Sequence, residues 1–367
     1  MKATPRHRSG GIALIMVMCA IFVLSALAAG LALSMKVETR LAQNADSEQE
    51  LLWLGRSGVE FARYVLSQHP PGEPFDSLNQ KWAGGPGSMA ESNGVLSSLS
   101  LDNYPVGEGT VSIKIIDLER KVNINNAVNR ANNPDYDPIL QSLTLMGVDA
   151  NEINVVSDSI KDWIDSDDSP LPAGAESDYY QGLAVPYFAK NAPIDDMSEL
   201  LLVKGIMDHP EIYWGGAATN HEPAQFQHKL GFGTAPGQIP DYPFGLTNIF
   251  TPFSSGKINV NTADANVLQM IPGVDANMAD AIIKLRAGPD GVDGTDDDTP
   301  FVNPGDALAR AGMEQNIAQR SAAYCDVKSS TFEVHVTAQF SGYKREFVAI
   351  LARFSGTEPQ VFSFYWK

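Results

Sequence analysis

Residues 12–35 read IALIMVMCAIFVLSALAAGLALSM and contain no charged side chain. A helix of this length reaches about 36 Å at roughly 1.5 Å per residue, which is enough to cross the hydrocarbon core of a bilayer. The preceding residues 1–11 are basic and carry Lys2, Arg6 and Arg8. Because basic flanks stay on the cytoplasmic side, we expect a single-pass anchor whose N-terminus lies in the cytoplasm and whose remaining chain lies on the far side.

The predicted helix continues beyond the apolar run. Residues 36–67 contain no proline, and Pro70-Pro71-Gly72 then ends the helical pattern. Small and apolar residues recur on one face of this segment, namely Leu52, Gly55, Val59, Ala62 and Leu66. Such a face predicts that the helix packs closely against a sheet.

Strand patterns occur in two separated parts of the remaining chain. Apolar and polar residues alternate in both parts, and Ser341-Gly342 marks a turn. The predicted strands are Thr110–Asp117, Thr331–Phe340, Phe347–Phe354 and Val361–Trp366, with Val122–Asn125 continuing the sheet after a turn.

Between these parts the pattern becomes helical. The predicted helices start at Asp137-Pro138 and at Asp149, the latter running to about Asp165, and cover Asp195–Val203, Ala263–Ile271 and Ala276–Arg286. Residues 72–107 and 215–256 are rich in Gly and Pro and are predicted to be loops. The order of helix, strand, helical block and strands predicts an α+β fold.

Composition excludes some classes of function. The chain of 367 residues has 26 Lys and Arg against 44 Asp and Glu, a net charge of −18. This balance argues against a protein that binds nucleic acid electrostatically, because affinity for phosphates comes from clustered basic residues. Its two cysteines are Cys19, inside the apolar run, and Cys325. An internal disulfide or a cysteine-based zinc site is therefore not expected.

A short basic leader, a glycine, an apolar helix about 55 residues long and a β-rich domain resemble the type IV pilin-like proteins. The resemblance implies that prepilin peptidase cuts between Gly11 and Ile12. Most members carry Glu at mature position five, where it neutralises the N-terminal amine of the subunit above. Here that position is Met16, and no acid occurs before Glu38. A subunit with nothing above it has no need of this Glu, and the minor pseudopilin K family of type II secretion systems is the group known to lack it.

The succession of motifs in the helical block also resembles the pseudopilin K family. It comprises Asp162-Trp163-Ile164-Asp165, Gly174-Ala175-Glu176, Asp178-Tyr179-Tyr180, Pro186-Tyr187 and Glu199-Leu200. The resemblance implies a type IV pilin-like fold, in which a long N-terminal transmembrane helix packs on an antiparallel sheet, with a large inserted α-helical domain. The implied segments are a leader peptide (1–11), a transmembrane helix (12–35), its periplasmic continuation (36–70), the first part of the pilin-like domain (71–128), the inserted domain (129–322) and the C-terminal β part (323–367).

By this resemblance the chain is a structural protein of the bacterial inner membrane, with its bulk in the periplasm. It would cap the pseudopilus or initiate its tip during protein export. The implied partners are the other minor pseudopilins of the I, J and H types, the major pseudopilin and prepilin peptidase, with the secretin and exported proteins as further contacts. Two alternatives remain: a minor pilin-like subunit of a type IV pilus or DNA-uptake machine, and a calcium-dependent enzyme on a membrane anchor.

One motif raises the question of DNA binding. Residues 259–263 and 271–274, NVNTA and IPGV, look like a helix–hairpin–helix, whose glycine turn can point N–H groups at a phosphate. However, Asp275 and Asp280 flank the hairpin where a phosphate contact would want Lys. A helical scaffold without nucleic acid is therefore the favoured interpretation.

Two acidic clusters are candidate calcium sites. The later one places Asp290, Asp293, Asp296, Asp297 and Asp298 within nine residues that also contain glycines. Calcium takes six to eight oxygen ligands on a flexible loop. The spacing is not that of a complete EF-hand, because Phe301 stands where that loop needs Glu.

The earlier cluster comprises Asp165, Asp167, Asp168, Glu176 and Asp178, and it follows a helix on which Asp158, Asp162 and Asp165 share one face. Like charges at this helical spacing repel one another, and a bound cation would offset the repulsion. The resemblance to pseudopilin K implies calcium, and the residues leave open which cluster binds it. A solvated acidic loop is the alternative for each.

Catalysis is not expected. Asp167 and Asp168 form the kind of acid pair that a glycosidase or a metal hydrolase uses. No GxSxG, HExxH or Walker motif occurs in the sequence. We therefore predict that the chain is not an enzyme.

Overall fold

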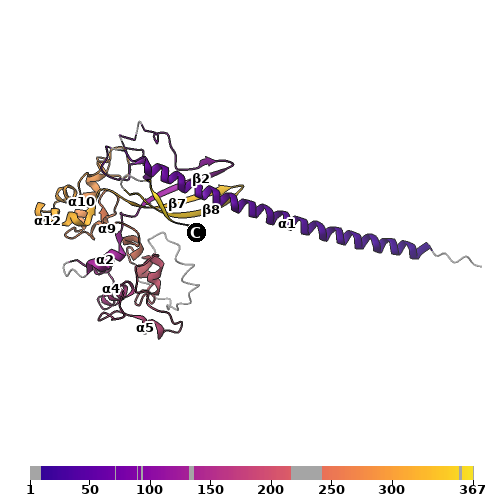
Figure 1. Ribbon diagram of the computed structural model, residues 1–367, viewed down its shortest axis with the longest axis horizontal. Coiled ribbons are helices and arrows are strands. Elements are labelled where there is room, and N and C mark those ends of the chain that lie inside the picture. Colours follow the sequence, from indigo (N-terminus) through magenta and orange to yellow (C-terminus); the bar gives the residue numbers. More distant parts are fainter. Residues whose placement is uncertain are drawn as a thin grey trace, which may run out of the picture.

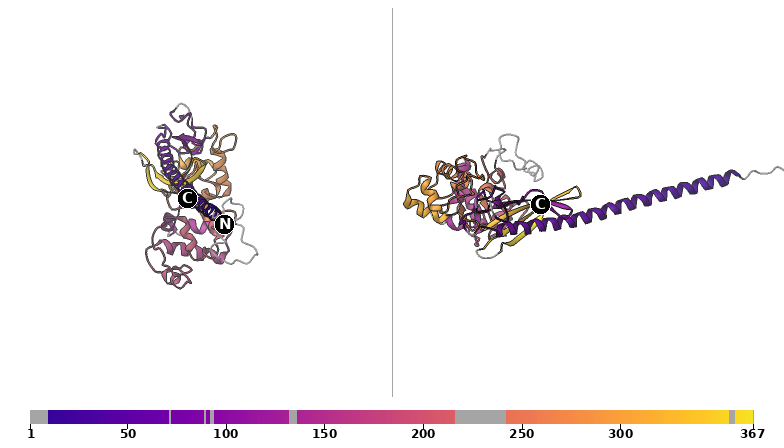
Figure 2. Two further views of the ribbon diagram at one scale, coloured as in Figure 1. Left: turned by 90° about the vertical axis from the view of Figure 1, so that its right-hand side faces the viewer. Right: turned by 90° about the horizontal axis from the view of Figure 1, so that it is seen from above.

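The computed structural model describes residues 10–70, 72–88, 90–91, 94–131, 136–215, 242–354 and 358–366. One helix, α1 (Gly10–Ser67), projects far out of a globular part (Figures 1 and 2). Its Ala13–Ser67 portion is long and apolar enough to cross a membrane. The side chains of residues 13–42 are exposed. The predicted continuous helix is confirmed, whereas residues 1–9 of the predicted leader lie outside the described part.

The second half of α1 packs against a five-stranded antiparallel sheet. Its strands are β1 (Tyr104–Val106), β2 (Gly109–Asp117), β7 (Thr331–Phe340), β8 (Tyr343–Ala352) and β9 (Gln360–Trp366), in the order β1-β2-β7-β8-β9. The register pairs Ile113 with Val336 and Val336 with Phe347. β2 lies in the first half of the chain and β7 in the last. The whole helical block is therefore inserted between two neighbouring strands of the sheet.

The helical block forms a separate hydrophobic core. Its helices are α2 (Ile124–Ala131), α3 (Pro138–Met146), α4 (Ala150–Ile164), α5 (Ser177–Gln181), α6 (Glu211–Trp214), α8 (Leu246–Ile249), α9 (Ala265–Leu268), α10 (Ala276–Arg286), α11 (Pro304–Arg310) and α12 (Gln315–Ser321). The described residues also form the short 3₁₀ helices η1 (Lys81–Ala83), η2 (Met197–Leu202) and η3 (Ala322–Tyr324). In Figure 1, α4 and α5 lie at one end of the block and α10 and α12 at another.

Several sequence predictions differ from the structure in detail. The predicted loops 72–107 and 215–256 contain η1, β1 and α8, and residues 216–241 of the second loop lie outside the described part. Val122–Asn125 does not extend the main sheet: β3 (Val122–Asn123) pairs in parallel with β4 (Phe250–Thr251), inside the helical block. The helix predicted for Asp195–Val203 is the shorter 3₁₀ helix η2 (Met197–Leu202) rather than an α-helix. The predicted helix 263–271 is reduced to α9, which Asp264 caps, because Pro272 and Gly273 follow closely. A second short parallel pair joins β5 (Ile258–Asn259) to β6 (Cys325–Asp326).

Buried polar groups join the sheet to the helical block. Asp117, at the end of β2, accepts hydrogen bonds from Thr262 Oγ1 at 2.5 Å and from Ser329 Oγ at 2.6 Å. Asp76, which is fully buried, forms an ion pair of 2.6 Å with Arg353. Burial raises the pKa of Asp117 to about 8. Because these partners come from both parts of the fold, the network fixes how the block sits on the sheet.

Candidate functional site

Three carboxylates of the earlier acidic cluster converge in the structure. Carboxylate oxygens of Asp165, Asp167 and Glu176 lie within 4.8 Å of one another. Glu176 is 4% exposed, and neither of its carboxylate oxygens has a hydrogen-bond partner. Oδ1 of Asp165 is also buried without a partner. Buried acceptors without donors are costly, so a cation here would satisfy oxygens that the described chain leaves unpaired.

Local structure brings these residues together. Asp165 is the C-cap of α4, and Glu176 directly precedes α5, so each carboxylate lies at a helix end. The loop between them folds back on α4, because Asp162 accepts hydrogen bonds from Leu171 N at 3.2 Å. Gly174 makes this approach feasible, since a Cβ there would overlap the Asp162 carboxylate.

Burial and mutual repulsion make it unfavourable for the carboxylates of this cluster to be ionised together. Burial, followed by the charges of Asp162 and Asp165, raises the pKa of Glu176 to about 7. Burial likewise raises the pKa of Asp165 and brings that of Asp162 to about 6. A divalent cation would remove this repulsion and favour the ionised carboxylates. Hard oxygen ligands of this kind suit calcium or magnesium.

Other acids of the earlier cluster are turned to different partners. Asp168 accepts a hydrogen bond from Asn191 Nδ2 at 2.9 Å. Asp178 is exposed in the first turn of α5. Asp158 accepts from Ala173 N, and Asp162 from Leu171 N, so both hold the loop. Of the three acids predicted to share a helix face, only Asp165 therefore joins the converging carboxylates.

The later acidic cluster bonds largely to itself. Asp293 forms an ion pair of 2.6 Å with Arg286, which is 4% exposed. Asp298 accepts from Gly294 N at 2.8 Å, and Asp297 accepts from Asp290 N at 2.9 Å. The remaining two acids are exposed: Asp290, which accepts from Val292 N at 2.8 Å, and Asp296. Among the described residues, three carboxylates do not meet here as they do beside α5.

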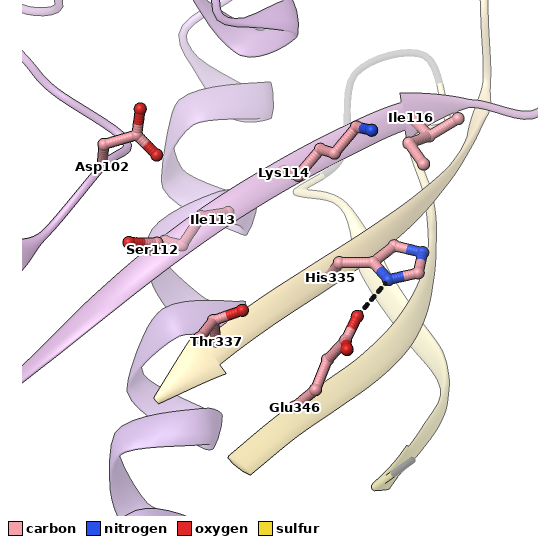
Figure 3. A pocket seen from close by; sticks show the side chains of 8 residues that line it. All are labelled: Asp102, Ser112, Ile113, Lys114, Ile116, His335, Thr337 and Glu346. Carbon is pink, nitrogen blue, oxygen red and sulfur yellow. Dashed lines mark hydrogen bonds and ion pairs between the residues drawn. The ribbon is translucent and has the colours of Figure 1, made fainter. Parts of the chain in front are cut away.

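A shallow depression of about 260 Å³ lies on the face of the sheet opposite α1 (Figure 3). His335 of β7 points toward Glu346 of β8, with Nδ1 2.8 Å from Oε1 of Glu346 and Nε2 2.5 Å from Oε1 of Glu333. These hydrogen bonds, led by that to Glu333, raise the pKa of His335. Both ring nitrogens are occupied by carboxylates, so the arrangement is an ion-pair triad rather than a free general base.

Sequence reasoning did not identify two of these features. In the sequence, Glu333 and His335 alternate with apolar residues, and Glu346 lies on the next strand. Only the β7–β8 register brings the three side chains together. The buried Asp117 network also escaped notice. Its one visible signal is an acid at the end of an otherwise apolar strand.

Comparison with known proteins points to one family. A family model described as type II secretion system (T2SS), protein K matches residues 120–212, and a helix-hairpin-helix motif matches residues 254–291. A type II secretion system protein K of Pseudomonas aeruginosa is 25% identical over 303 residues, which cover 80% of this chain and 77% of that protein. The protein K of Aeromonas hydrophila is 26% identical over 213 residues, covering 54% of this chain and 60% of that protein.

The fold is also found among solved structures. A chain in the crystal structure of the GspK-GspI-GspJ complex of the enterotoxigenic Escherichia coli type 2 secretion system superposes with a TM-score of 0.61 at 17% identity. The likeness covers 89% of this chain and 99% of that chain, and it confirms the predicted pilin-like α+β fold with its helical insertion. The matching family model, the relatives and the fold all support the family of type II secretion system protein K for this chain.

Proposed function

We propose that this chain is the minor pseudopilin that caps the pseudopilus or initiates its tip, and that its work is structural rather than catalytic. The observation that carries this proposal is α1: the side chains of residues 13–42 are all exposed, and residues 13–35 among them carry no charge. An apolar helix of this length needs lipid or other helices around it. Such a helix would be surrounded by lipid while the subunit is in the membrane and by the helices of neighbouring subunits once it is in the filament.

The proposal includes sidedness and processing. The basic leader favours a cytoplasmic N-terminus, which would place the globular part in the periplasm. Prepilin peptidase would cut between Gly11 and Ile12, leaving Ile12 as the first residue of the mature chain.

Its partners would be other pilin-like subunits. The solved neighbour was crystallised in a complex with GspI and GspJ, and we expect corresponding minor pseudopilins, the H type and the major pseudopilin to contact this chain. The secretin and exported proteins are expected at the tip. A type IV pilus or DNA-uptake role is less favoured, because Asp264, Asp275 and Asp280 surround the helix–hairpin–helix and would repel phosphate.

Calcium would act as a structural ion beside α5. Asp165, Asp167 and Glu176 would hold it, and the unpartnered oxygens of Glu176 support this assignment over the later loop. The ion would tie the end of α4 to the start of α5. It has no assigned part in any reaction.

Two measurements on the full chain test the function. N-terminal sequencing of the protein purified from cells should begin at Ile12. Purification from detergent-solubilised membranes should bring down other pilin-like subunits. A start beyond residue 25 would indicate ordinary signal cleavage, and a chain that brings down none of these subunits would not be a pseudopilin.

A further inference from the structure

The last strand of the sheet carries a band of exposed aromatic side chains. Phe362 is 63% exposed and Trp366 is 65% exposed, and Val361 adds a further apolar surface. β9 is an edge strand, and residues 360–366 contain no proline and no charged residue. Proteins usually protect a free edge with such residues. An unprotected, aromatic edge indicates a surface that a partner covers.

Pairing places Trp366, Phe364 and Val361 on the face of the sheet that α1 covers, and Phe362 lies at the register shift between them. Trp366 pairs with Phe347, whose ring lies against Gly55 of α1, and the ring of Phe364 stacks on Phe347 at 5.4 Å. Paired residues point to the same side of a sheet. Trp366 and Phe364 therefore face the α1 side, but α1 packs mainly on β7 and on the flanking β2 and β8.

Spacing determines what fits there. β9 lies two strands from β7, a lateral distance of about 9.6 Å at roughly 4.8 Å per strand. Two packed helices lie about 8–10 Å apart. A second helix beside α1 would therefore lie over β9 and cover its aromatic side chains.

The opposite flank of α1 is already filled by the chain itself. There Phe61 stacks on Tyr104 of β1 at 4.6 Å, and Trp82 and Leu96 join the same core. Only the β9 flank is open for another helix among the described residues. α1 leaves the globular part beside the sheet (Figure 1), so a helix that accompanies α1 out of the membrane would reach this flank.

Charges on this flank indicate the chemistry of the partner helix. Leu52, Arg56 and Arg63 follow at i, i+4 and i+11 and so lie on one side of α1. Arg63 is paired with Glu60 at 2.7 Å and with Glu358 at 3.1 Å. In the described part of the chain Arg56 forms no ion pair and only lies over the Trp53 ring. A matching helix would present an apolar stripe to β9 and an acidic side chain to Arg56.

We propose that the α1-facing side of β9, together with Arg56, binds the N-terminal helix of a neighbouring pilin-like subunit that runs alongside α1. The inference rests on the proposed function and adds the surface through which this chain meets its neighbour. It commits to a helix, whereas a strand added to the β9 edge, a second copy of this chain or an exported protein are the rival occupants.

Photo-crosslinking of the full chain distinguishes these occupants. The photoreactive residue p-benzoylphenylalanine is placed at position 362 or 366, in cells that carry the complete secretion system. Position 188 is the control, because Phe188 is 69% exposed but lies in the helical block. Positions 362 and 366 should give an adduct that maps to the N-terminal helix of another pilin-like subunit, which position 188 should not give. An adduct with a strand, a second copy or an exported protein, or no adduct from either position, would overturn the inference.

Exposed-residue variants provide a second measurement. Phe362→Ser combined with Trp366→Ser should lower co-purification of that subunit about tenfold or more, as expected for aromatic anchors. Arg56→Glu should also lower it, and Arg56→Lys should retain it. Val185→Ser combined with Phe188→Ser, equally exposed but in the helical block, is the matched control and should change nothing. Unchanged melting temperatures would show that all variants fold.

The outcomes separate this inference from the proposed function. If wild type brings down no pilin-like subunit, the function itself fails. If wild type and the Phe362/Trp366 double variant bring down the same amount, the function stands and the β9 surface is refuted.

Discussion

Gly58 of α1 lies directly against Val336 of β7. A Cβ on Gly58 would overlap Val336 Cγ1 and lie 3.1 Å from Cγ2. Gly55, one turn earlier, meets the ring of Phe347 in the same way. These two glycines let the helix axis approach the middle strands of the sheet, whose buried side chains Val336 and Phe347 belong to the core of the pilin-like part.

Gly58→Ala should lower the free energy of unfolding by about 1–3 kcal/mol, because the extra methyl group overpacks the interface. On an exposed helix the same change would stabilise by about 1 kcal/mol through helix propensity, so the sign of the effect is diagnostic. Urea unfolding of the chain from residue 36 onward measures it. Val336→Ala in the same chain should relieve part of the loss, giving a coupling of about 1 kcal/mol. Ser57→Ala, exposed on the same helix turn, is the control; a stabilising Gly58→Ala would contradict the close packing.

The His335 triad predicts a pH dependence of stability. The folded pKa of His335 is raised, so the charged form is stabilised, fully so below the ordinary value near 6.5. Stability should then fall as the pH rises from 6.5 through the higher folded pKa, by about 0.5–1 kcal/mol for a partly exposed ion pair. His335→Gln should make the slope shallower by this amount, and the part that remains comes from Glu176 and Asp117, whose raised pKa values titrate in the same window. Thr337→Ser, in the same depression, should keep it, and equal slopes in wild type and His335→Gln would rule out the triad as its source.

The sequence predicts the long helix and the main strands because both follow strong periodic signals. The apolar run of residues 12–35 and the alternation in 331–340 depend only on local spacing. Asp149 and Asp165 also mark the ends of α4 correctly, since capping is a local interaction. The Val122–Asn125 prediction failed because a strand of two residues has no period, and its partner Phe250 is remote in the sequence.

The candidate site could be predicted only in part, for a related reason. Acidic residues are visible in a sequence, but the bend that brings Glu176 back to Asp165 is not. That bend depends on Asp162 binding the backbone of residue 171 and on the space left by Gly174. Without it, Asp168 and Asp178 are as plausible as ligands as Asp167. The later loop looks equally acidic in the sequence, and only the structure reveals that Arg286 neutralises Asp293.

Position five of the proposed mature chain makes a further prediction. Met16 is exposed on α1, and Met16→Glu would place a carboxylate that can neutralise the amine of a subunit above. We expect wild type only at filament ends and the variant also at internal positions, as seen by gold labelling and electron microscopy. Met18→Glu is the control: it carries the same insertion cost, about 2–3 kcal/mol at the bilayer centre, without the correct position. Wild type distributed along the filament would refute the tip assignment.

Calcium binding beside α5 should stabilise the folded chain. A ligand that binds only the folded state contributes about 2.7 kcal/mol at a hundredfold excess over its Kd. The chain from residue 36 onward should therefore melt several degrees higher, by roughly 2–4 °C per kcal/mol, in millimolar calcium than in chelator. Magnesium should shift melting much less, because it prefers a tight octahedron and retains its waters. No shift in calcium would contradict a structural site.

Two charge-matched double variants then locate the ion. Asp165→Asn with Glu176→Gln should abolish the calcium shift, whereas Asp290→Asn with Asp296→Asn should retain it. Each pair removes two negative charges, so general screening of an acidic surface would affect both alike. In chelator, Glu176→Gln alone should melt above wild type, because it removes a buried charge that Asp162 and Asp165 repel. A calcium shift lost only in the Asp290/Asp296 variant would move the ion to the later loop. Calcium and the Glu176→Gln substitution relieve the same repulsion among the carboxylates of this cluster. Removing the Glu176 charge should therefore raise the melting temperature without calcium and weaken the further rise that calcium causes.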